Sequence, residues 1–278
     1  MIHFVTYCVD IGKHNAKDLI FALNNLLSSI DRNIKDYHII VYSNFDIKEF
    51  CKNPKVEVRK YKRAEENKLY GVGGWLNLSN NKIYTCRSLK KETGIDYFWI
   101  DLDSIVTADL SYLNDYPNMF ITINADTKKP NPIFHNNDKM MIGRGIYICG
   151  SLWKLDDRAN HIVTLAYEDI HSKKLQPRFD LQDVFNYAFY FYHREMREGW
   201  NPDEININGY NCLHDVSYSL SWSTGHPKES CLSNLYYNDN NELMSKINNK
   251  KVHILGWVMQ HYKRVNQEAI DKALGVNL

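Results

Sequence analysis

Two aspartates separated by one residue, Asp101 and Asp103, are the strongest chemical signal in the sequence. They follow the run YFWI, which is typical of a buried strand, so both carboxylates come where such a strand ends. Two carboxylates this close repel each other and resist burial unless positive charge lies beside them. A hard divalent cation, Mn²⁺ or Mg²⁺, meets that need and keeps coordination positions open for substrate phosphates. The alternative is that the two aspartates only cap a turn after the strand.

The first half of the sequence alternates short apolar runs with helical patterns, which predicts βαβ units on a mainly parallel sheet. We expect strands at residues 4–9, 38–43, 56–61 and 97–101, and helices at residues 15–30 and 80–93. Asn15 or Asp18 caps the first helix, and Gly94 ends the second in the left-handed conformation. The third strand alternates apolar and charged residues, as an edge strand does. Ligands of open α/β sheets bind at the carboxyl ends of the strands, where Asp101 and Asp103 are expected.

The second half adds strands and helices and then loses its periodicity. Further strands are expected at residues 121–124 and 146–150, on either side of a polar loop with Pro130 and Pro132, and helices at residues 156–171 and 180–195. Asp180 is a natural N-cap for the second of these helices. Residues 200–249 are rich in Asn, Ser and Tyr and are predicted to be mostly irregular or short β hairpins, followed by a last short strand at residues 251–257. The predicted fold class is α/β, with a mixed, mainly parallel sheet, flanking helices and a C-terminal elaboration.

Three segments are similar to glycosyltransferase motifs. The run YFWIDLDSIVTADLSYL strongly resembles the Asp-x-Asp region of GT-A fold glycosyltransferases, in which Asp109 and Leu110 match a second Asp-Leu pair. The run FDLQDVFNYAF from Phe179 resembles the Gln-Asp-x-x-Asn helix start of the retaining family 8 transferases, the group that contains glycogenin and lipopolysaccharide galactosyltransferases. The run VHILGW from Val252 resembles the C-terminal His-x-x-Gly element of the same family. The resemblance therefore implies a GT-A, Rossmann-like fold.

The same resemblance implies one domain over residues 1–278. Its nucleotide-binding half covers residues 1–125, and its acceptor-side half covers residues 126–278 and includes the C-terminal metal-ligand segment. The implied reaction moves a hexose from a nucleotide-diphosphate sugar, a UDP-sugar, to a glycan or another hydroxyl acceptor, with Mn²⁺ or Mg²⁺ as cofactor.

The resemblance also assigns residues to this reaction. Asp101, Asp103 and His253 would bind the metal, with Asp101 also contacting the donor, and Gly256 would lie against the diphosphate. Gln182 or Asp183 would lie near the reacting face if the configuration is retained, and Asp183 would be the base toward the acceptor if it is inverted. On physical grounds alone, a histidine on an apolar strand is more often a core residue than a ligand.

Four further residues are candidates for binding the donor. By position, Thr6, Tyr7 and Asp10 lie at the end of the first strand, which holds the nucleotide base in GT-A enzymes. The ring of Tyr7 could stack on uracil or could simply be part of the core. The helix before YFWID carries Lys82 and Arg87, and resembling enzymes place a basic residue there that reaches the ribose or the diphosphate. Lys82 is preferred because it lies nearer the start of the helix.

The chain also departs from the family 8 pattern. After the His-x-x-Gly element, Trp257, Val258 and Met259 stand where the family continues to a lysine and a proline, so Lys263 or Arg264 would have to replace that lysine. Leu181 occupies the position of an aspartate that contacts a donor-sugar hydroxyl.

The composition narrows the class of protein. The 34 basic and 33 acidic residues nearly cancel, which gives no global attraction to nucleic acid. The six cysteines form no Cys-x-x-Cys pair, as expected for reduced thiols in a cytoplasmic protein. The opening run MIHFVTYCV lacks a basic flank and reads as a strand, not a signal peptide. The apolar run from Val184 is far shorter than the roughly 20 residues of a transmembrane helix, although peripheral membrane contact is compatible with the sequence.

Two other functions fit parts of the pattern. A haloacid-dehalogenase-type phosphohydrolase also carries Asp-x-Asp after a strand, but its motif lies near the N-terminus and has Thr or Val where this chain has Ile105. A non-catalytic carbohydrate-binding protein would use the abundant Tyr and Trp rings to stack on sugars, although such rings can equally form a core.

Overall fold

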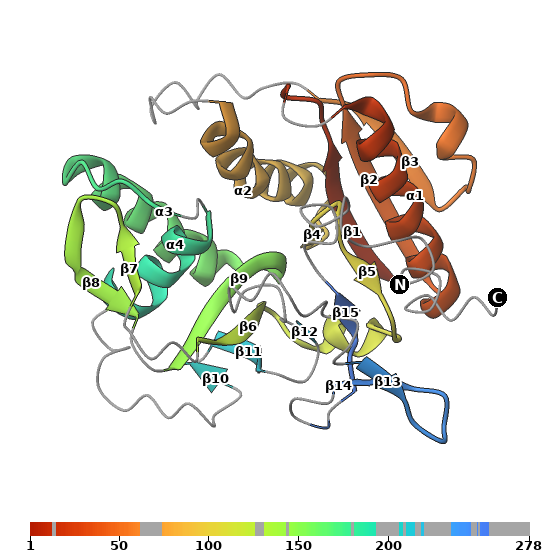
Figure 1. Cartoon of the computed structure of the whole chain (residues 1–278). Coiled ribbons are helices and arrows are strands. Elements are labelled where there is room, and N and C mark those ends of the chain that lie inside the picture. The colour runs from red at the N-terminus through yellow and green to blue at the C-terminus, as the bar shows by residue number, and fades with distance from the viewer. Residues whose placement is uncertain are drawn as a thin grey trace. The chain divides into compact units, whose positions relative to one another are not determined.

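The computed structural model groups the chain into two compact units (Figure 1). The first unit comprises Met1–Tyr61, Ile100–Asp115 and Asp215–Leu278, and the second comprises Lys62–Trp99 and Tyr116–His214. The structure describes residues 1–12, 15–61, 74–125, 131–142, 145–178, 181–192, 206–207, 210–214, 218–219, 235–245, 249 and 251–255. Both units are thus built from segments that are far apart in the sequence.

The first unit is built on parallel strands. Strand β1 (Ile2–Cys8) pairs with β2 (Tyr37–Ser43), which pairs with β3 (Val56–Lys60) at the end of the sheet. Six of the seven residues of β1 are buried, so this strand lies in the core of the unit. The expected edge position of the third strand is confirmed.

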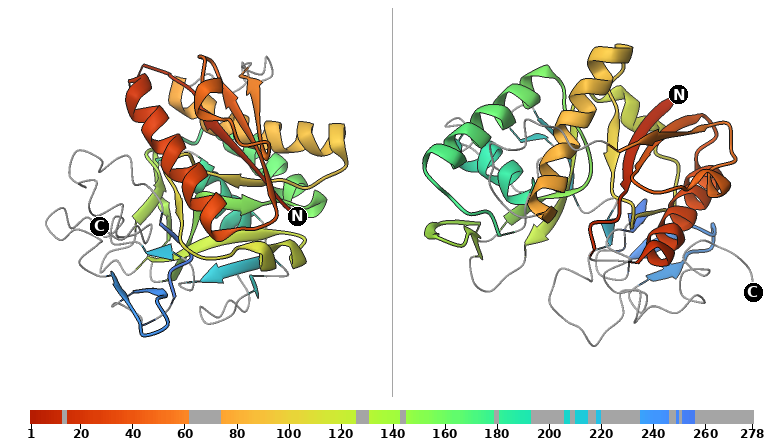
Figure 2. Two further views of the ribbon diagram at one scale, coloured as in Figure 1. Left: turned by 90° about the vertical axis from the view of Figure 1, so that its right-hand side faces the viewer. Right: turned by 90° about the horizontal axis from the view of Figure 1, so that it is seen from above.

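Helix α1 (Ala16–Asn33) covers one face of these strands (Figure 2). Asn15 caps it as expected, since its side chain accepts a hydrogen bond from the Asp18 N–H at 2.9 Å. The thiol of Cys8 on β1 lies 3.9 Å from the Leu19 carbonyl, so Cys8 points toward this helix. The buried face of the helix consists of Leu19, Ala22, Leu23, Leu26, Ser29 and Ile30.

Shorter elements complete the first unit. The boundary between the units falls within β4 (Phe98–Ile100), which neighbours β1 in the strand order. A second sheet has the order β12 (Tyr218–Ser219), β15 (Ile254–Leu255), β5 (Ile105–Val106), and β13 (Leu235–Tyr237) forms a hairpin with β14 (Leu243–Ser245). Short 3-10 helices span Lys48–Phe50 and Ser111–Asp115.

The second unit has its own strands and helices. Its strands follow the order β10 (Asn206–Ile207), β11 (Tyr210–His214), β6 (Met119–Ala125), β9 (Gly145–Lys154), in which β11 and β6 are parallel and the other two pairs antiparallel. Its helices are α2 (Gly74–Thr93), α3 (Asp157–Ser172) and α4 (Leu181–Asn186), which continues as the π-helix Tyr187–Tyr192.

Aromatic rings form the core of the second unit. The rings of Trp99 and Trp153 stack with centroids 6.1 Å apart, and Phe185 meets Trp153 edge-on at 5.4 Å. Phe120 contacts both Phe185 and Phe189. All five rings are at most 1% exposed, so they account for much of the apolar area that this unit buries.

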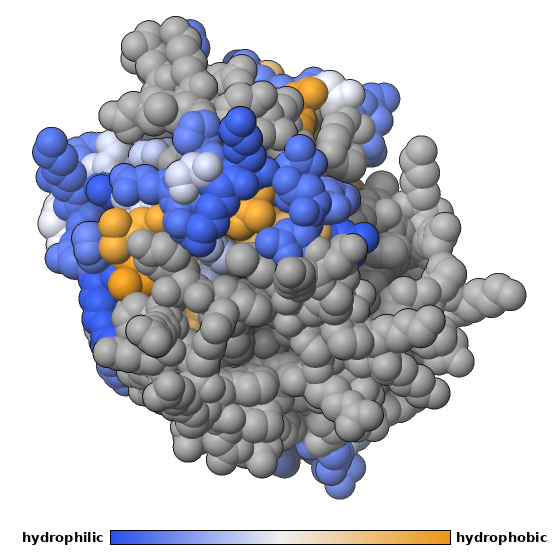
Figure 3. Space-filling view, turned by 90° about the vertical axis from the view of Figure 1, so that its left-hand side faces the viewer, coloured by the Kyte–Doolittle hydropathy of each residue, from blue (hydrophilic) through white to orange (hydrophobic). Residues whose placement is uncertain are grey.

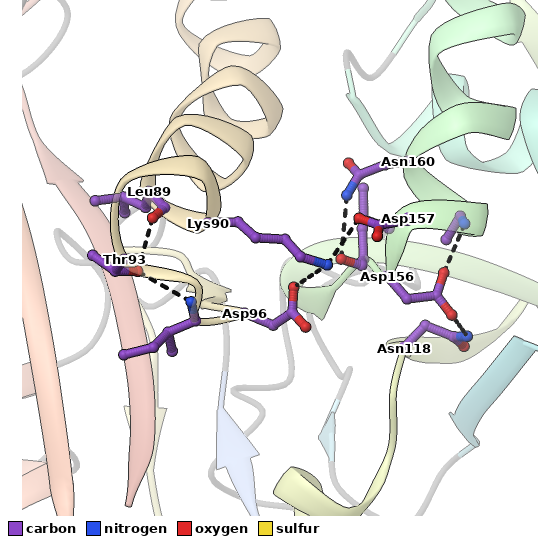
Figure 4. A network of polar contacts seen from close by, with 11 residues as sticks. Leu89, Lys90, Thr93, Asp96, Asn118, Asp156, Asp157 and Asn160 are labelled. Atoms are coloured by element: carbon purple, nitrogen blue, oxygen red, sulfur yellow. Dashed lines mark hydrogen bonds and ion pairs between the residues drawn. The ribbon is translucent and has the colours of Figure 1, made fainter.

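Polar contacts join α2 to α3 (Figure 4). The Lys90 ammonium, near the end of α2, lies 2.9 Å from Asp96 and 2.8 Å from Asp157. Asp156 caps α3 by accepting the Ala159 N–H at 2.7 Å, and its other oxygen accepts a hydrogen bond from Asn118. The network therefore links the start of α3 to the end of α2.

Several expected elements need correction. The predicted polar loop is wrong at Pro132, because β7 (Asn131–Phe134) and β8 (Asn137–Ile142) form a hairpin there, and Pro130 lies outside the described residues. Pro132 lies where the register of this hairpin shifts, between Pro132 and Phe134, and proline is tolerated at such irregularities. Helix α2 begins at Gly74, ahead of the predicted start at residue 80. The expected cap Asp180 lies outside the described residues.

The described surface is mainly polar. On the face seen in Figure 3, hydrophilic residues dominate the coloured area, and hydrophobic residues show in smaller areas between them. Met1, at 63%, is the one large hydrophobic residue that is exposed in the described part of the chain. None of the described helices is long and apolar enough to cross a membrane.

Candidate functional site

The acidic pair Asp101 and Asp103 follows directly after the buried strand β4. Leu102 and Ser104 alternate with the two acids and are only 9% and 1% exposed, whereas the acids themselves are partly exposed. The Ser104 N–H donates to the Asp101 carbonyl at 3.1 Å and closes a tight turn. The turn buries its apolar and hydroxyl side chains and leaves both carboxylates accessible, as a site for a cation or a ligand requires.

The segment after the acidic pair is held by the C-terminal part of the chain. Strand β5 pairs antiparallel with β15, with Val106 opposite Ile254. Thr107 donates its N–H to the His253 carbonyl at 2.9 Å and its hydroxyl to the Val252 carbonyl at 2.5 Å. The backbone of His253 therefore supports the segment that leads away from the acids.

The imidazole of His253 has a different neighbour. Its Nδ1 lies 3.0 Å from the Tyr112 hydroxyl, and the two rings meet edge-on with centroids 5.7 Å apart. Burial lowers the pKa of His253, and the nearby Lys251 ammonium lowers it further, while Glu242 opposes this shift. The neutral ring is therefore favoured, which is the form that metal ligation requires.

The three predicted metal ligands do not form a cluster. Nowhere in the described part of the chain do three His, Cys, Asp or Glu side chains gather closely enough to hold a metal ion. The register places His253 opposite Thr107, four residues beyond Asp103. The carboxylates of Asp101 and Asp103 have the donor chemistry that Mn²⁺ or Mg²⁺ prefers, and such ions often take the remaining ligands from water and phosphate. The pair fits a cation, and His253 as its third ligand stays a prediction.

The predicted donor-binding residues on β1 point to opposite faces of the sheet. Thr6 lies on the face that Cys8 shares with α1, is fully buried, and its hydroxyl has no hydrogen-bond partner among the described residues. Tyr7 lies on the other face and is 6% exposed. Its ring meets Tyr61 at 5.1 Å and Tyr42 at 6.0 Å, both nearly edge-on, and these two tyrosines are half-buried.

Sequence reasoning missed Tyr42 and Tyr61. Tyr42 lies directly opposite Tyr7 in the parallel register of β1 and β2, and Tyr61 immediately follows β3. The signal was present as an aromatic residue near the carboxyl end of each strand, but only the pairing register shows that the three rings meet.

Asp10 is fixed by a neighbour that the sequence analysis also missed. The Asp10 N–H donates to the Asn44 side chain at 2.9 Å, and Asn44 donates back to the Asp10 carbonyl at 2.8 Å. One Asp10 carboxylate oxygen accepts the N–H of Gly12, which has a φ of 79° that favours glycine. The loops that follow β1 and β2 are thereby held together.

Lys82 and the Gln-Asp-x-x-Asn segment belong to the second unit. The Lys82 ammonium lies 4.9 Å from the ring centroid of Trp99. Gln182 accepts the Gly150 N–H at 3.1 Å, and Asn186 bonds to both the N–H and the carbonyl of Ile148 at 2.9 and 3.0 Å. The first and last residues of the motif therefore attach α4 to β9.

Asp183 and Gly256 are the remaining residues of the predicted site. Asp183 lies between Gln182 and Asn186 in the sequence of α4, and its side chain is fully buried. Gly256 lies outside the described residues. The catalytic roles of Gln182 and Asp183 and the donor contacts of Lys82 and Gly256 remain predictions.

Comparison with known proteins identifies a similar fold. No protein-family model matches the chain, and no curated protein matches it. The apo structure of WbbM, a bifunctional glycosyltransferase, superposes with a TM-score of 0.55 at 12% sequence identity. The match covers 99% of this chain and 50% of that one, so the chain spans half the length of this neighbour. The likeness confirms the predicted α/β class, with a mainly parallel sheet flanked by helices as in glycosyltransferases.

Proposed function

We propose that this protein is a glycosyltransferase that moves a hexose from a nucleotide-diphosphate sugar, a UDP-sugar, to a glycan or another hydroxyl acceptor. The observation that carries the proposal is the accessible pair Asp101 and Asp103, at the end of a buried strand, on a chain whose fold resembles a glycosyltransferase. Fold alone does not determine function, so the proposal depends on the chemistry of this pair.

The chemistry of the pair suits a sugar diphosphate. Breaking the bond from the anomeric carbon to the diphosphate leaves negative charge on the leaving group while the sugar ring gains oxocarbenium character. A divalent cation, when bound, supplies positive charge to that leaving group. Asp101 and Asp103 would hold the cation from one side, and their turn, closed by the Ser104 N–H, keeps the two carboxylates in a fixed relation.

The tyrosine cluster of the same unit suits the nucleotide base. Tyr7 is too buried to offer a whole ring face, but the half-buried rings of Tyr42 and Tyr61 lie against it. A base that stacks on one aromatic ring gains about 1 to 3 kcal/mol of binding free energy. Asp10, held by Asn44 in the loop after β1, is the candidate for a polar contact to the base or ribose.

A thermal-shift screen tests the proposal. Nucleoside diphosphates are added to the protein with and without Mn²⁺, and a ligand at one hundred times its Kd should raise the Tm by roughly 5 °C through mass action. We expect UDP with Mn²⁺ to raise the Tm and UDP with EDTA to raise it much less. No shift with any nucleoside diphosphate would contradict the proposal.

Tests with other ligands distinguish the proposed transferase from a phosphohydrolase and from a carbohydrate-binding protein. Hydrolysis of a generic aryl phosphate would support a phosphohydrolase, whereas a transferase should leave that compound intact. A shift in Tm with free sugars but not with UDP would support a carbohydrate-binding protein that has no need of a diphosphate.

A further inference from the structure

Strand β5 is held by side chains of α1 as well as by β15. Val106 is fully buried, so its backbone N–H and carbonyl need partners within the protein. The N–H donates to the Ser29 hydroxyl at 3.0 Å, and the carbonyl accepts from the Asn33 side-chain amide at 2.9 Å. Ser29 and Asn33 are four residues apart in the last turns of α1 and therefore face the same way.

Each of the two α1 side chains also forms a hydrogen bond within its own helix. The Ser29 hydroxyl accepts from Val106 and donates to the Leu26 carbonyl at 2.8 Å. The Asn33 amide donates to Val106 and also to the Ser29 carbonyl at 3.0 Å. Serine and asparagine are poorer helix formers than the alkyl residues that pack this helix face, so their presence here is explained by the bonds to β5.

The opposite edge of the same segment belongs to the C-terminal part of the chain. Successive residues of a strand direct their backbone groups to opposite edges, and Thr107 bonds to His253 and Val252 where Val106 bonds to α1. The segment from Asp101 to Val106 thus begins at the end of the buried strand β4. It ends in residues whose backbone is hydrogen-bonded on both edges.

We propose that Ser29 and Asn33 are positioning residues for the acidic pair Asp101 and Asp103. By fixing Val106 they fix the spacing and direction with which the two carboxylates meet a divalent cation and a nucleoside diphosphate. The inference rests on the proposed function and adds to it two residues of α1 that touch neither ligand.

The test compares Ser29→Ala with Ser28→Ala, because Ser28 is the adjacent, exposed serine of the same helix. The first readout is hydrogen exchange of the Val106 amide, which should speed up in Ser29→Ala and stay unchanged in Ser28→Ala. The second is the Mn²⁺ concentration at half-maximal UDP binding, measured by calorimetry well below the Tm. Residues that orient metal ligands typically change metal affinity 10- to 100-fold, so for this more distant contact we expect the midpoint to rise about 3- to 10-fold.

A second pair of variants tests the bond from the Asn33 amide to the Val106 carbonyl. Asn33→Ala should raise the same Mn²⁺ midpoint, and Asn24→Ala, at an exposed position of α1, should leave it at the wild-type value. If Ser29→Ala and Asn33→Ala lower the Tm but keep the wild-type midpoint, the contact is only structural and the inference is overturned while the proposed function stands. If the wild-type protein binds no UDP with Mn²⁺, the proposed function fails and the inference fails with it.

Discussion

His3 shows how a single side chain can make stability depend on pH. It pairs with His38 across β1 and β2, and the two rings lie 5.9 Å apart. Burial lowers the pKa of His3, the neighbouring His38 and the N-terminal ammonium lower it further, and Asp36 opposes them. The folded protein therefore takes up a proton at this position less readily than the unfolded chain does.

We predict that the free energy of unfolding falls as the pH drops through about 6.5, the ordinary pKa of histidine. The sign follows from the lowered pKa of His3 in the folded state, since protonation then favours the unfolded chain. The contribution of neutral His3 to the free energy of unfolding is fully present above the pKa of His3 in the unfolded chain. It is lost as the pH falls from that value through the lower pKa of the folded state. Urea unfolding at pH 7.5 and pH 5.0 measures the loss, which should be smaller in His3→Gln.

The matched control for this experiment is His161→Gln, which replaces an exposed histidine of α3. Its loss of stability between the two pH values should equal that of the wild type. An equal loss in His3→Gln and wild type would show that other groups cause the pH dependence.

Some features of the candidate site could be predicted from the sequence and others could not. The pattern of a buried strand followed by Asp101 and Asp103 was readable, because the strand is apolar up to its last residue. The partner of the His253 imidazole was not, since Tyr112 lies 141 positions away and no local pattern links the two. The same holds for Tyr42 and Tyr61, whose contacts with Tyr7 depend on the strand register.

At the scale of elements, local signals predicted the start of α1 and the end of α2, but not the start of α2 or the β7–β8 hairpin. Asn15 accepts an N–H group of α1 as expected, and Gly94 has a φ of 73° at the end of α2. Asp156 was expected to be the first residue of α3, and the structure shows that it is the N-cap of this helix. Capping is a contact between residues three or four apart, so the sequence contains all the information it needs. The β7–β8 hairpin was missed because Pro132 reads as a loop residue unless the register shift between Pro132 and Phe134 is known.

The cap of α3 yields a prediction at this scale. Asp156→Ala removes the acceptor for the Ala159 N–H and for the Asn118 amide (Figure 4). We expect a loss of about 1 to 2 kcal/mol in the free energy of unfolding, measured by urea denaturation. Asp157→Ala is the control, because that side chain is 87% exposed and its ion pair with Lys90 contributes little. Equal losses in the two variants would show that Asp156 does not act as a cap.

The attachment of α4 to β9 yields a second prediction. Asn186→Ala leaves the N–H and the carbonyl of buried Ile148 without their partner, so we expect a loss of about 2 to 4 kcal/mol. Gln182→Ala removes one bond, to the Gly150 N–H, and should cost less, about 1 kcal/mol. Chemical denaturation of both variants measures the difference. A greater loss in Gln182→Ala would contradict this account of the motif.

At the scale of the whole molecule, each compact unit combines distant parts of the sequence. Strand β15 joins β5 although Ile254 and Val106 are 148 positions apart, and β11 joins β6 in the second unit. Alternation of apolar runs predicted the α/β class, but it could not show which distant strands pair, because pairing depends on long-range contacts. The division of the chain into halves at residue 125 stays a prediction.

The central claim is tested most directly by the turnover of a UDP-sugar in the presence of Mn²⁺, compared between wild type, Asp103→Ala and Asp115→Ala. Asp103 is placed at the site by the turn after β4 and packs no core, so its replacement should leave the circular dichroism spectrum unchanged. Asp115 is an exposed aspartate of the same unit and serves as the control. We predict that the wild type and Asp115→Ala release UDP at the same rate, and that Asp103→Ala is slower by about 100-fold or more, on the order of a lost electrostatic contact in a transition state. A folded Asp103→Ala protein that turns over the UDP-sugar at the wild-type rate would contradict the account.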